Sequence, residues 1–394
     1  MTIKEYIADN IEKTLRHGDD SNPMLIALPY PYTVPSAEGF FQEMYYWDTY
    51  FVNKALIALG MVGQAINNLE NFKWMIGQYG FIPNGNRLEL LNRSQPPLFT
   101  LAVMDVWEYL DAEKRAEFVE AIKTEYEFWQ TQRRAENGLN HYGCSADDAT
   151  CLDFILLYEH RVGKKLPRTV EMGRNLVAEA ESGWDFTPRF PDGCLNYCAA
   201  DLNAILYGVE IFLSEHDAEN CAKWAAFARS RRERMSALQV EGGAFCDYSL
   251  GNKRPSGVLS SAGFFPYFTG ASDDVEGYKR LLAALERDHG TVACLSGGEG
   301  VFQWAEPNGW PPLIYVCVAA AERLGLKDDA MRISKKYVGM VERIFEKTGK
   351  LFEKYNVVTG NIGLGENYGT PEMLGWSAGV YLSLKGYLEN GTLL

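Results

Sequence analysis

Carboxylates recur beside tryptophans in the loops of this sequence, a mixture that suits the binding and cleavage of a neutral, hydroxyl-rich ligand. The stretch EMYYWDTYF places Asp48 next to Trp47, and ESGWDFTPRF places Asp185 between Trp184 and Phe186. Tryptophan rings stack on the C–H faces of sugars, whereas polar side chains beside them supply hydrogen bonds. A carboxylate among aromatic rings is costly unless it is used. We therefore interpret these loops as parts of a sugar site.

Further loops carry the same mixture of aromatic, amide and charged residues. They are FIPNGNRLELLNRSQPP, with Asn84, Arg93 and Gln95; VFQWAEPNGWPPL, with Gln303 and Trp304; and LFEKYNVVTGNIGLGENYG, with Glu353 and Glu366. Each alone is better explained by a capped turn, a helix N-terminus or a surface pair such as Asp185 with Arg189. Their recurrence favours a common site with two acids, which is what hydrolysis of a glycosidic bond requires.

Other chemistries lack their residue patterns. There is no GxSxG nucleophile motif, and the five histidines are scattered. The Gly-rich segment is neither a Walker loop nor a dinucleotide fingerprint. The eight cysteines form no CxxC pair, so we expect no metal and no cofactor, and we interpret the cysteines as buried free thiols of a reducing cytosol.

The composition indicates a globular protein that does not bind polyanions. The formal net charge is −14, which argues against nucleic acid and against an anionic membrane surface. No run of 18 apolar residues predicts a spanning helix, and the N-terminal stretch has no apolar signal core. We therefore predict a cytoplasmic protein, a monomer or small homo-oligomer, whose partner is a small carbohydrate.

Helical periodicity dominates the chain, and strand alternation is short and rare. About twelve helices are expected, at residues 4–16, 48–60, 62–78, 97–109, 112–132, 168–181, 198–215, 218–238, 271–287, 311–324, 326–347 and 370–390. No linker divides the chain, so we predict one all-α domain over residues 1–394. A ring of helices with the aromatic and Gly-rich loops at one end fits this pattern better than a solenoid, since no motif repeats at a fixed period.

The ordered motifs resemble trehalases of glycoside hydrolase family 37. They are PYPYTVP…EMYYWDTYF, PNGNR…NRSQPP, ESGWDF, DLNAILY, QWAEPNGWPPL and EKYNV…GLGENY…GWSAGV, from about residue 29 to 385. The resemblance implies an (α/α)6 barrel and an inverting mechanism without a metal. It implies Asp185 as general acid and Glu353 as general base, roughly 6.5–9.5 Å apart. We expect the flanking rings to desolvate Asp185 and raise its pKa, and Glu353 to stay ionised.

The resemblance also implies the residues around the substrate. Those expected to bind it are Phe40, Trp47, Asp48, Asn84, Arg93, Gln95, Trp184, Gln303, Trp304 and, in a lid over the second sugar, Glu366.

Several departures from the family concern the second sugar. Phe40 stands roughly where trehalases have an arginine, and Ala305 replaces an aspartate. The family's Arg-Pro-Glu element is missing, and Thr150 and Leu152 fall near its Arg and Glu. We therefore expect the substrate to be trehalose, a related α-glucoside, or an α-glycoside of a small group such as glycerate, whose charge an arginine or His141 would bind.

Other functions stay open as alternatives. A silent sugar-binding protein would not need both acids. A phosphorylase would need a cationic phosphate pocket and an epimerase paired histidines, and neither is visible in the sequence.

Overall fold

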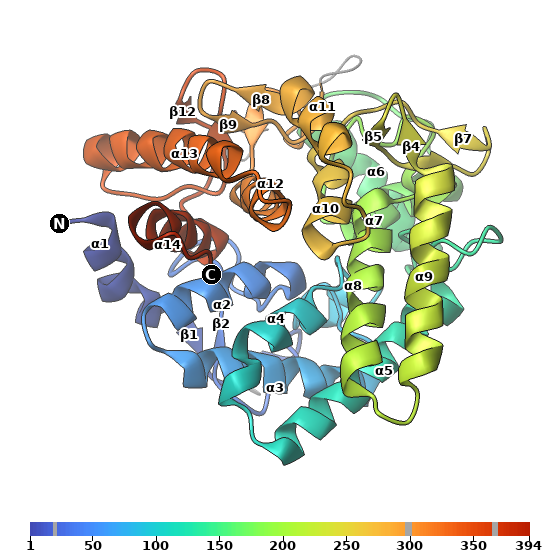
Figure 1. Ribbon diagram of the computed structural model, residues 1–394, viewed down its shortest axis with the longest axis horizontal. Coiled ribbons are helices and arrows are strands. Elements are labelled where there is room, and N and C mark those ends of the chain that lie inside the picture. The colour runs from blue at the N-terminus through green and yellow to red at the C-terminus, as the bar shows by residue number, and fades with distance from the viewer. Residues whose placement is uncertain (19–21, 296–301, 365–368) are drawn as a thin grey trace.

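The computed structural model describes residues 1–18, 22–295, 302–364 and 369–394, and helices dominate this part of the chain (Figure 1). The helices are α1 (Ile3–Asn10), α2 (Tyr46–Ala58), α3 (Val62–Tyr79), α4 (Phe99–Val106), α5 (Ala112–Gln132), α6 (Asp148–Val162), α7 (Val170–Glu181), α8 (Ala200–His216), α9 (Cys221–Leu238), α10 (Phe265–Thr269), α11 (Val275–Leu285), α12 (Pro311–Arg323), α13 (Lys327–Thr348) and α14 (Gly375–Asn390).

Six of these helices form a closed inner ring. α2 contacts α4, α4 contacts α8, and the ring continues through α10, α12 and α14 back to α2. Helices α3, α5, α9 and α13 pack outside this ring, each against at least one inner helix (Figure 1). The predicted all-α (α/α)6 barrel is confirmed.

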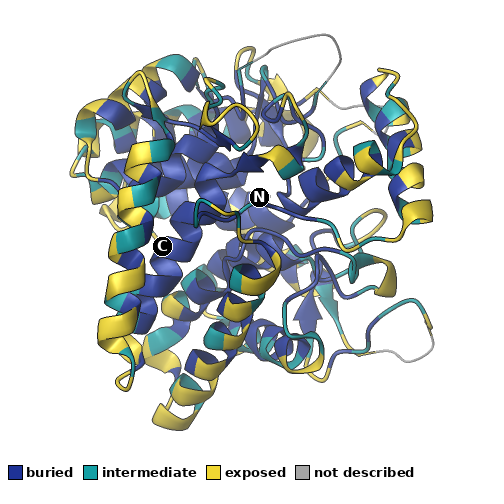
Figure 2. Ribbon diagram, turned by 90° about the vertical axis from the view of Figure 1, so that its right-hand side faces the viewer, coloured by how far each residue is buried: buried dark blue, intermediate teal, exposed yellow. Residues whose placement is uncertain are grey.

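The inner helices are buried on nearly all sides, whereas the outer helices turn an exposed face to solvent (Figure 2). All residues of α2 except its last two are buried, including polar Asn53 and the ion-paired Lys54. A helix surrounded by protein needs no amphipathic stripe. In α13, by contrast, the buried residues recur at helical spacing along one face.

Helix α6 was not expected from the sequence. Its buried positions Cys151, Ile155, Tyr158 and Val162 follow a helical spacing, and Asp147 caps its first turn by accepting a hydrogen bond from the Thr150 N–H. Leu152 and Leu156, however, are exposed on the opposite face. Apolar residues on both faces blur the amphipathic pattern, which explains why the helix was missed. The short helix α10 was missed as well.

The strands are two-residue pairings that fix loops. They are β1 (Leu15–Arg16), β2 (Tyr32–Thr33), β3 (Tyr197–Cys198), β4 (Val240–Glu241), β5 (Ala244–Phe245), β6 (Tyr248–Ser249), β7 (Arg254–Pro255), β8 (Glu286–Arg287), β9 (Gly290–Thr291), β10 (Asn308–Gly309), β11 (Tyr355–Asn356) and β12 (Asn361–Ile362). They pair antiparallel as β1-β2, β3-β6-β7, β4-β5, β8-β9 and β10-β11-β12.

One large hydrophobic cluster contains residues from every helix except α6, as a single domain requires. The division of the chain into one domain nevertheless stays a prediction. The described helices are each too short or too polar to span a lipid bilayer.

The contact between α14 and α2 depends on a glycine. A Cβ added to Gly379 would lie 1.8 Å from the carbonyl oxygen of Phe51, whereas one added to Gly386 on the same helix would meet nothing within 4 Å. We predict that Gly379→Ala lowers the free energy of unfolding by at least about 2 kcal/mol. Gly386→Ala should change it by at most about 1 kcal/mol, toward higher stability. Urea unfolding of both variants measures this, and equal effects would contradict it.

Candidate active site

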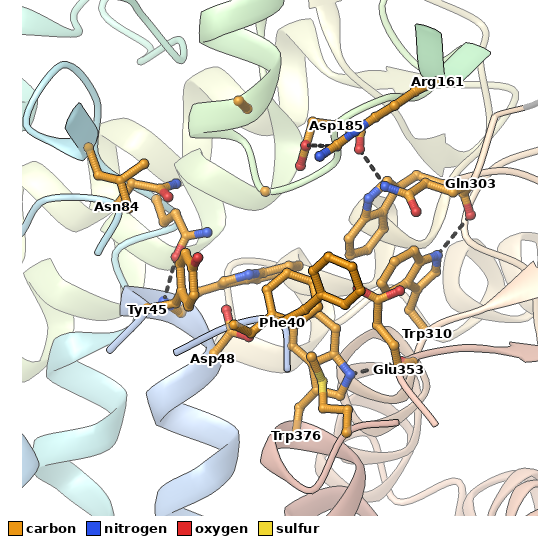
Figure 3. Close-up of a pocket in the computed structure, with 18 of the residues that line it drawn as sticks. Phe40, Tyr45, Asp48, Asn84, Arg161, Asp185, Gln303, Trp310, Glu353 and Trp376 are labelled. Carbon is orange, nitrogen blue, oxygen red and sulfur yellow. Dashed lines mark hydrogen bonds and ion pairs between the residues drawn. The ribbon is translucent and has the colours of Figure 1, made fainter. Parts of the chain in front are cut away.

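A cavity of about 430 Å³ opens among the loops that carry the sequence motifs. Its size is typical of a small-molecule site. Its lining includes ten of the twelve residues predicted to act on the substrate: Phe40, Trp47, Asp48, Asn84, Arg93, Gln95, Asp185, Gln303, Trp304 and Glu353 (Figure 3). The surface of Phe40 is 63% exposed, whereas the other nine residues are buried or half-buried.

The two remaining predicted residues do not line the cavity in the described structure. Trp184 is fully buried and stacks on Trp304, with ring centroids 5.4 Å apart. It supports a wall of the site rather than facing a ligand. Glu366, predicted to belong to a lid, lies outside the described residues.

Trp47 and Asp48 are fixed by the start of α2. The Trp47 N–H donates to the side-chain oxygen of Gln95 at 3.1 Å, so an amide from another loop caps the helix. The Trp47 ring packs against Gly183, which has a φ of +79°. A Cβ on Gly183 would lie 3.0 Å from this ring, so both the backbone conformation and the close approach favour glycine. This contact joins the EMYYWDTYF and ESGWDF segments.

Five tryptophans form a connected aromatic wall. The rings of Trp304 and Trp310 are parallel, with centroids 3.6 Å apart. Trp304 also stacks on Trp184 and contacts Trp47, while Trp376 packs edge-on against Trp47 and Trp310. Such a wall offers flat apolar surface to the C–H face of a sugar ring.

Arg189 fixes the loop that follows Asp185. Its buried guanidinium donates to both oxygens of Asp201 and both of Asp247, at 2.7–2.8 Å. It also lies 4.7 Å above the ring of Trp184. The local surface pair of Arg189 with Asp185, open as an alternative from the sequence, is therefore wrong.

Asp185 faces the cavity beside a cation. Its carboxylate accepts a hydrogen bond from Arg161 Nη1 at 2.8 Å, and its backbone oxygen accepts one from Gln303 Nε2 at 2.6 Å. The flanking rings of Trp184 and Phe186 are fully buried, but the Asp185 side chain is 31% exposed. The predicted desolvation of this carboxylate is thus wrong, because the rings turn into the core while the carboxylate turns outward.

Glu353 is buried where Asp185 is not. Its carboxylate pairs with Lys354 Nζ at 2.5 Å, and its backbone oxygen accepts a hydrogen bond from the indole of Trp376. Burial raises the pKa of Glu353, the Lys354 ammonium opposes this shift, and the charge of Asp185 adds to it. The ion pair favours the ionised form that we predicted, whereas burial disfavours it.

Asp48 is a third carboxyl group in the cavity. Burial, together with the negative charges of Glu353 and Asp185, raises its pKa to about 8. It therefore holds a proton at neutral pH. A neutral carboxyl group both donates and accepts hydrogen bonds, which suits contact with sugar hydroxyls.

Arg93 lies buried between the cavity and α6. Its Nη1 donates to the Asn92 side chain at 2.6 Å, and its guanidinium lies 5.1 Å from the ring of Phe154. Its Nε has no hydrogen-bond partner. The backbone N–H of Asn84 donates to the Arg93 carbonyl oxygen, which joins the two ends of this loop.

The sequence analysis missed several cavity residues. Tyr45 lines the cavity, as do Trp310 and Trp376 from the recognised motifs. His160 and Arg161 were also missed, since they end a helix that carries no motif. A lone His-Arg pair after an apolar run gave no signal of a site.

Three residues discussed for the second sugar lie elsewhere. Thr150 is in the first turn of α6 and Leu152 is exposed; neither lines the cavity. His141 is also absent from its lining, and its Nδ1 lies 2.8 Å from the Tyr142 carbonyl oxygen. The expectation that His141 contacts a charged substrate is therefore wrong.

The eight cysteines are unpaired, as predicted, and six of them are buried, whereas Cys144 is half-buried and Cys221 is exposed, against the prediction. Among the described residues, no three His, Cys, Asp or Glu side chains gather in a way that would hold a metal ion.

The comparisons with known proteins agree with the resemblance noted in the sequence. The sequence profile of the Trehalase family matches residues 2–388. The periplasmic trehalase of Pseudomonas aeruginosa is 31% identical, over 97% of this chain and 76% of that protein. The periplasmic trehalase of Xanthomonas axonopodis pv. citri is 33% identical, over 97% and 72% respectively.

Solved structures share the fold. The neutral trehalase of Saccharomyces cerevisiae superposes with a TM-score of 0.77 at 23% identity, over 99% of this chain and 80% of that one. A family 63 mannosylglycerate hydrolase from Thermus thermophilus, in complex with Tris and D-glycerate, gives a TM-score of 0.66 at 16% identity, over 96% and 99%.

The names of the relatives contradict the predicted cytoplasmic location, because they describe periplasmic trehalases. The prediction depended on the N-terminal residues and on unpaired cysteines, and neither feature fixes a compartment.

We predict that Arg189→Gln destabilises the protein by about 3–5 kcal/mol, because it leaves two carboxylates buried without a cation. Arg174→Gln is the matched control, since Arg174 pairs with Asp148 at 3.2 Å on the exposed surface. That change should cost less than about 1 kcal/mol. Urea unfolding followed by circular dichroism measures both, and similar costs would contradict the role assigned to Arg189.

The raised pKa of Asp48 predicts a pH dependence of stability. The folded state retains a proton that the unfolded state loses, so stability falls as the pH rises from about 4 to 8. The Asp48→Asn variant has no carboxyl group at this position, so it lacks this contribution to the pH dependence of stability. We expect the slope of the unfolding free energy against pH to be smaller in the variant than in the wild type, by roughly 1 kcal/mol per pH unit. Urea unfolding at pH 5, 6.5 and 8 measures both slopes, and parallel slopes would show that Asp48 is ionised throughout.

Proposed function

Since this chain belongs to the trehalase family of glycoside hydrolases, we propose that it hydrolyses the α-glucosidic bond of trehalose or a related small α-glucoside. The reaction would invert the anomeric carbon, with Asp185 acting as general acid and Glu353 as general base. The observation that carries the proposal is the meeting of these two carboxyl groups in one cavity of sugar-binding size. Asp185 lies on one side of this cavity, and Glu353 and Asp48 lie on the other (Figure 3).

The environments of the two groups suit different roles. Asp185 is partly exposed to the cavity, where it would donate its proton to the glycosidic oxygen as the bond breaks. Glu353 is buried against Lys354, and its raised pKa makes it a stronger base toward a water on the opposite face of the sugar. In inversion the water attacks the anomeric carbon directly, Glu353 takes its proton, and the leaving group receives the proton of Asp185.

The remaining predicted residues would hold the cleaved sugar. Trp47 and Trp304 supply apolar faces, and the neutral carboxyl of Asp48 supplies a donor and an acceptor. Asn84 and Gln95 lie in the same lining and add amide groups. Gln95 uses its side-chain oxygen to cap α2, which leaves its NH2 group for a hydroxyl.

A second candidate is an α-glycoside whose leaving group is not glucose. Thr150 and Leu152, at the positions of the family's second-sugar grip, do not line the cavity. The Thermus thermophilus relative is named a mannosylglycerate hydrolase. A small leaving group such as glycerate would fit a site whose second-sugar contacts have changed.

Proton NMR of the protein with trehalose tests the proposal. An inverting enzyme releases α- and β-glucose in equal early amounts, because only one of the two sugars is inverted. Asp185→Asn should lower kcat on the order of 10³-fold and retain sugar binding. Asp153→Asn, at an exposed position of α6, is the control and should keep full activity.

Early release of α-glucose alone would contradict inversion. Turnover of other small α-glycosides but not of trehalose would select the second candidate. A folded protein that cleaves no α-glycoside would overturn the proposal.

A further inference from the structure

Two of the eight cysteines, Cys144 and Cys151, are in direct contact. Their Sγ atoms lie 3.8 Å apart. Cys144 is half-buried in the loop that precedes α6, whereas Cys151 is fully buried in the first turn of this helix. In the described part of the chain, no other two cysteines make such a contact. This pair is therefore the place at which thiol chemistry can join two segments of the protein.

The turn between the two residues holds the thiols together. Ala146 donates its N–H to Cys144 Sγ at 3.3 Å, and Asp147 accepts hydrogen bonds from the N–H groups of Thr150 and Cys151. The sulfur atoms of a disulfide are about 2.05 Å apart, so these two must approach by roughly 1.8 Å. Rotation of one side chain about its Cα–Cβ bond moves its sulfur by on the order of 3 Å. Side-chain rotation can thus close the gap while the cap of α6 stays in place.

A metal ion is the alternative use of two neighbouring thiols. Structural metal sites take four ligands, and two cysteines supply only half of them. Among the residues whose positions the structure gives, no third His, Cys, Asp or Glu side chain joins this pair in a group that would hold a metal. The geometry therefore favours oxidation of the pair over metal binding.

We propose that Cys144 and Cys151 form a disulfide by exchange with a low-molecular-weight disulfide such as glutathione disulfide. The thiolate of Cys144 attacks one sulfur of glutathione disulfide, and one glutathione leaves. Cys151 then gives up its proton, its sulfur attacks Cys144 Sγ, and the second glutathione leaves. Both protein thiols are oxidised, and the glutathione disulfide is reduced to two thiols that take up the two protons. This modification site does not depend on the proposed function.

The environments of the two thiols set the order of these steps. Burial raises the pKa of the Cys151 thiol to about 11, and the charge of Cys144 adds to this shift. Cys151 is therefore rarely a thiolate, and burial closes it to a bulky oxidant, so the first exchange falls to Cys144. In the mixed disulfide Cys144 carries no charge, and its sulfur already lies beside Cys151. The second exchange is then intramolecular.

The disulfide ties α6 to a segment that is already fixed. On this segment Gly143 donates its N–H to Glu181, and Ser145 donates its N–H to the carbonyl oxygen of Asn92. Helix α6 packs on α7 through a small separate cluster, and its other end reaches the cavity beside Asp185. A covalent link at its first turn therefore opposes local opening of the helix that closes this side of the cavity.

Peptide mapping without reduction tests the inference. The folded protein is incubated with glutathione disulfide, its free thiols are blocked, and it is cleaved with the protease Asp-N. This protease cuts before Asp147 and Asp148, between the two cysteines. The two peptides then stay together only through a disulfide. We expect a linked pair from the oxidised wild type, and dithiothreitol should separate it.

Three variants sharpen this test. Cys151→Ser should leave Cys144 as a mixed disulfide with glutathione, whereas Cys144→Ser should leave Cys151 unmodified. Cys221→Ser is the matched control, because Cys221 is exposed at the start of α9, and this variant should keep the link. Circular dichroism shows that each variant is folded.

Hydrogen exchange measures the effect on the helix. The amides of α6 should exchange at least about 10-fold more slowly in the oxidised than in the reduced wild type. Glutathione disulfide should not slow them in Cys151→Ser.

The inference is wrong if Asp-N separates the two peptides of the treated, folded wild type. It is equally wrong if Cys144 or Cys151 is found linked to one of the other six cysteines. A link that forms without slowing exchange in α6 would show that the disulfide does not anchor this helix.

Discussion

The position of the candidate acid depends on one buried cation. The guanidinium of Arg189 donates four hydrogen bonds to Asp201, in the first turn of α8, and to Asp247, which precedes β6. Asp247 also accepts the N–H of Ala200 and so caps α8 from outside the helix. One charged group therefore joins the Asp185 loop, an inner helix and a strand pair. Because neither carboxylate can be buried without the cation, these three segments are fixed together.

Other buried carboxylates around the site also join separate segments, because they accept hydrogen bonds from the backbone of another element. Glu181, at the end of α7, accepts the N–H of Ser94 and a bidentate contact from Arg133. Glu179, two residues earlier in α7, accepts the N–H of Thr187, just beyond Asp185. Such charge-assisted bonds are short and directional. They fix loops that have almost no regular secondary structure, so the cavity is held in shape by side chains beneath it.

The sequence predicted features that depend on residues close together in the chain, and it misled where a feature depends on tertiary packing. Helix periodicity identified α13 because its core face is distinct, but α6 was missed because exposed Leu152 and Leu156 resemble core residues. Of the twelve residues predicted for the site, ten line the cavity, and they come from the loops in which aromatic, amide and charged residues recur. The neighbours of Asp185 in sequence suggested burial, whereas the loop turns their rings inward and the carboxylate outward. No local pattern indicates that Arg161 reaches Asp185, since that contact depends on how α6 packs.

The two sides of the cavity are supported by different hydrophobic clusters. The side next to Asp48 is built on α2 and the tryptophan wall, within the main core. The side next to Asp185 is closed by α6, which packs on α7 through a separate small cluster that includes Ile155, Tyr158 and Phe186. A substitution at the cavity end of α6 therefore leaves the main core in place. Thr150, Leu152 and Arg161 all belong to α6, so the sequence of this helix can change on one side of the cavity without disturbing α2.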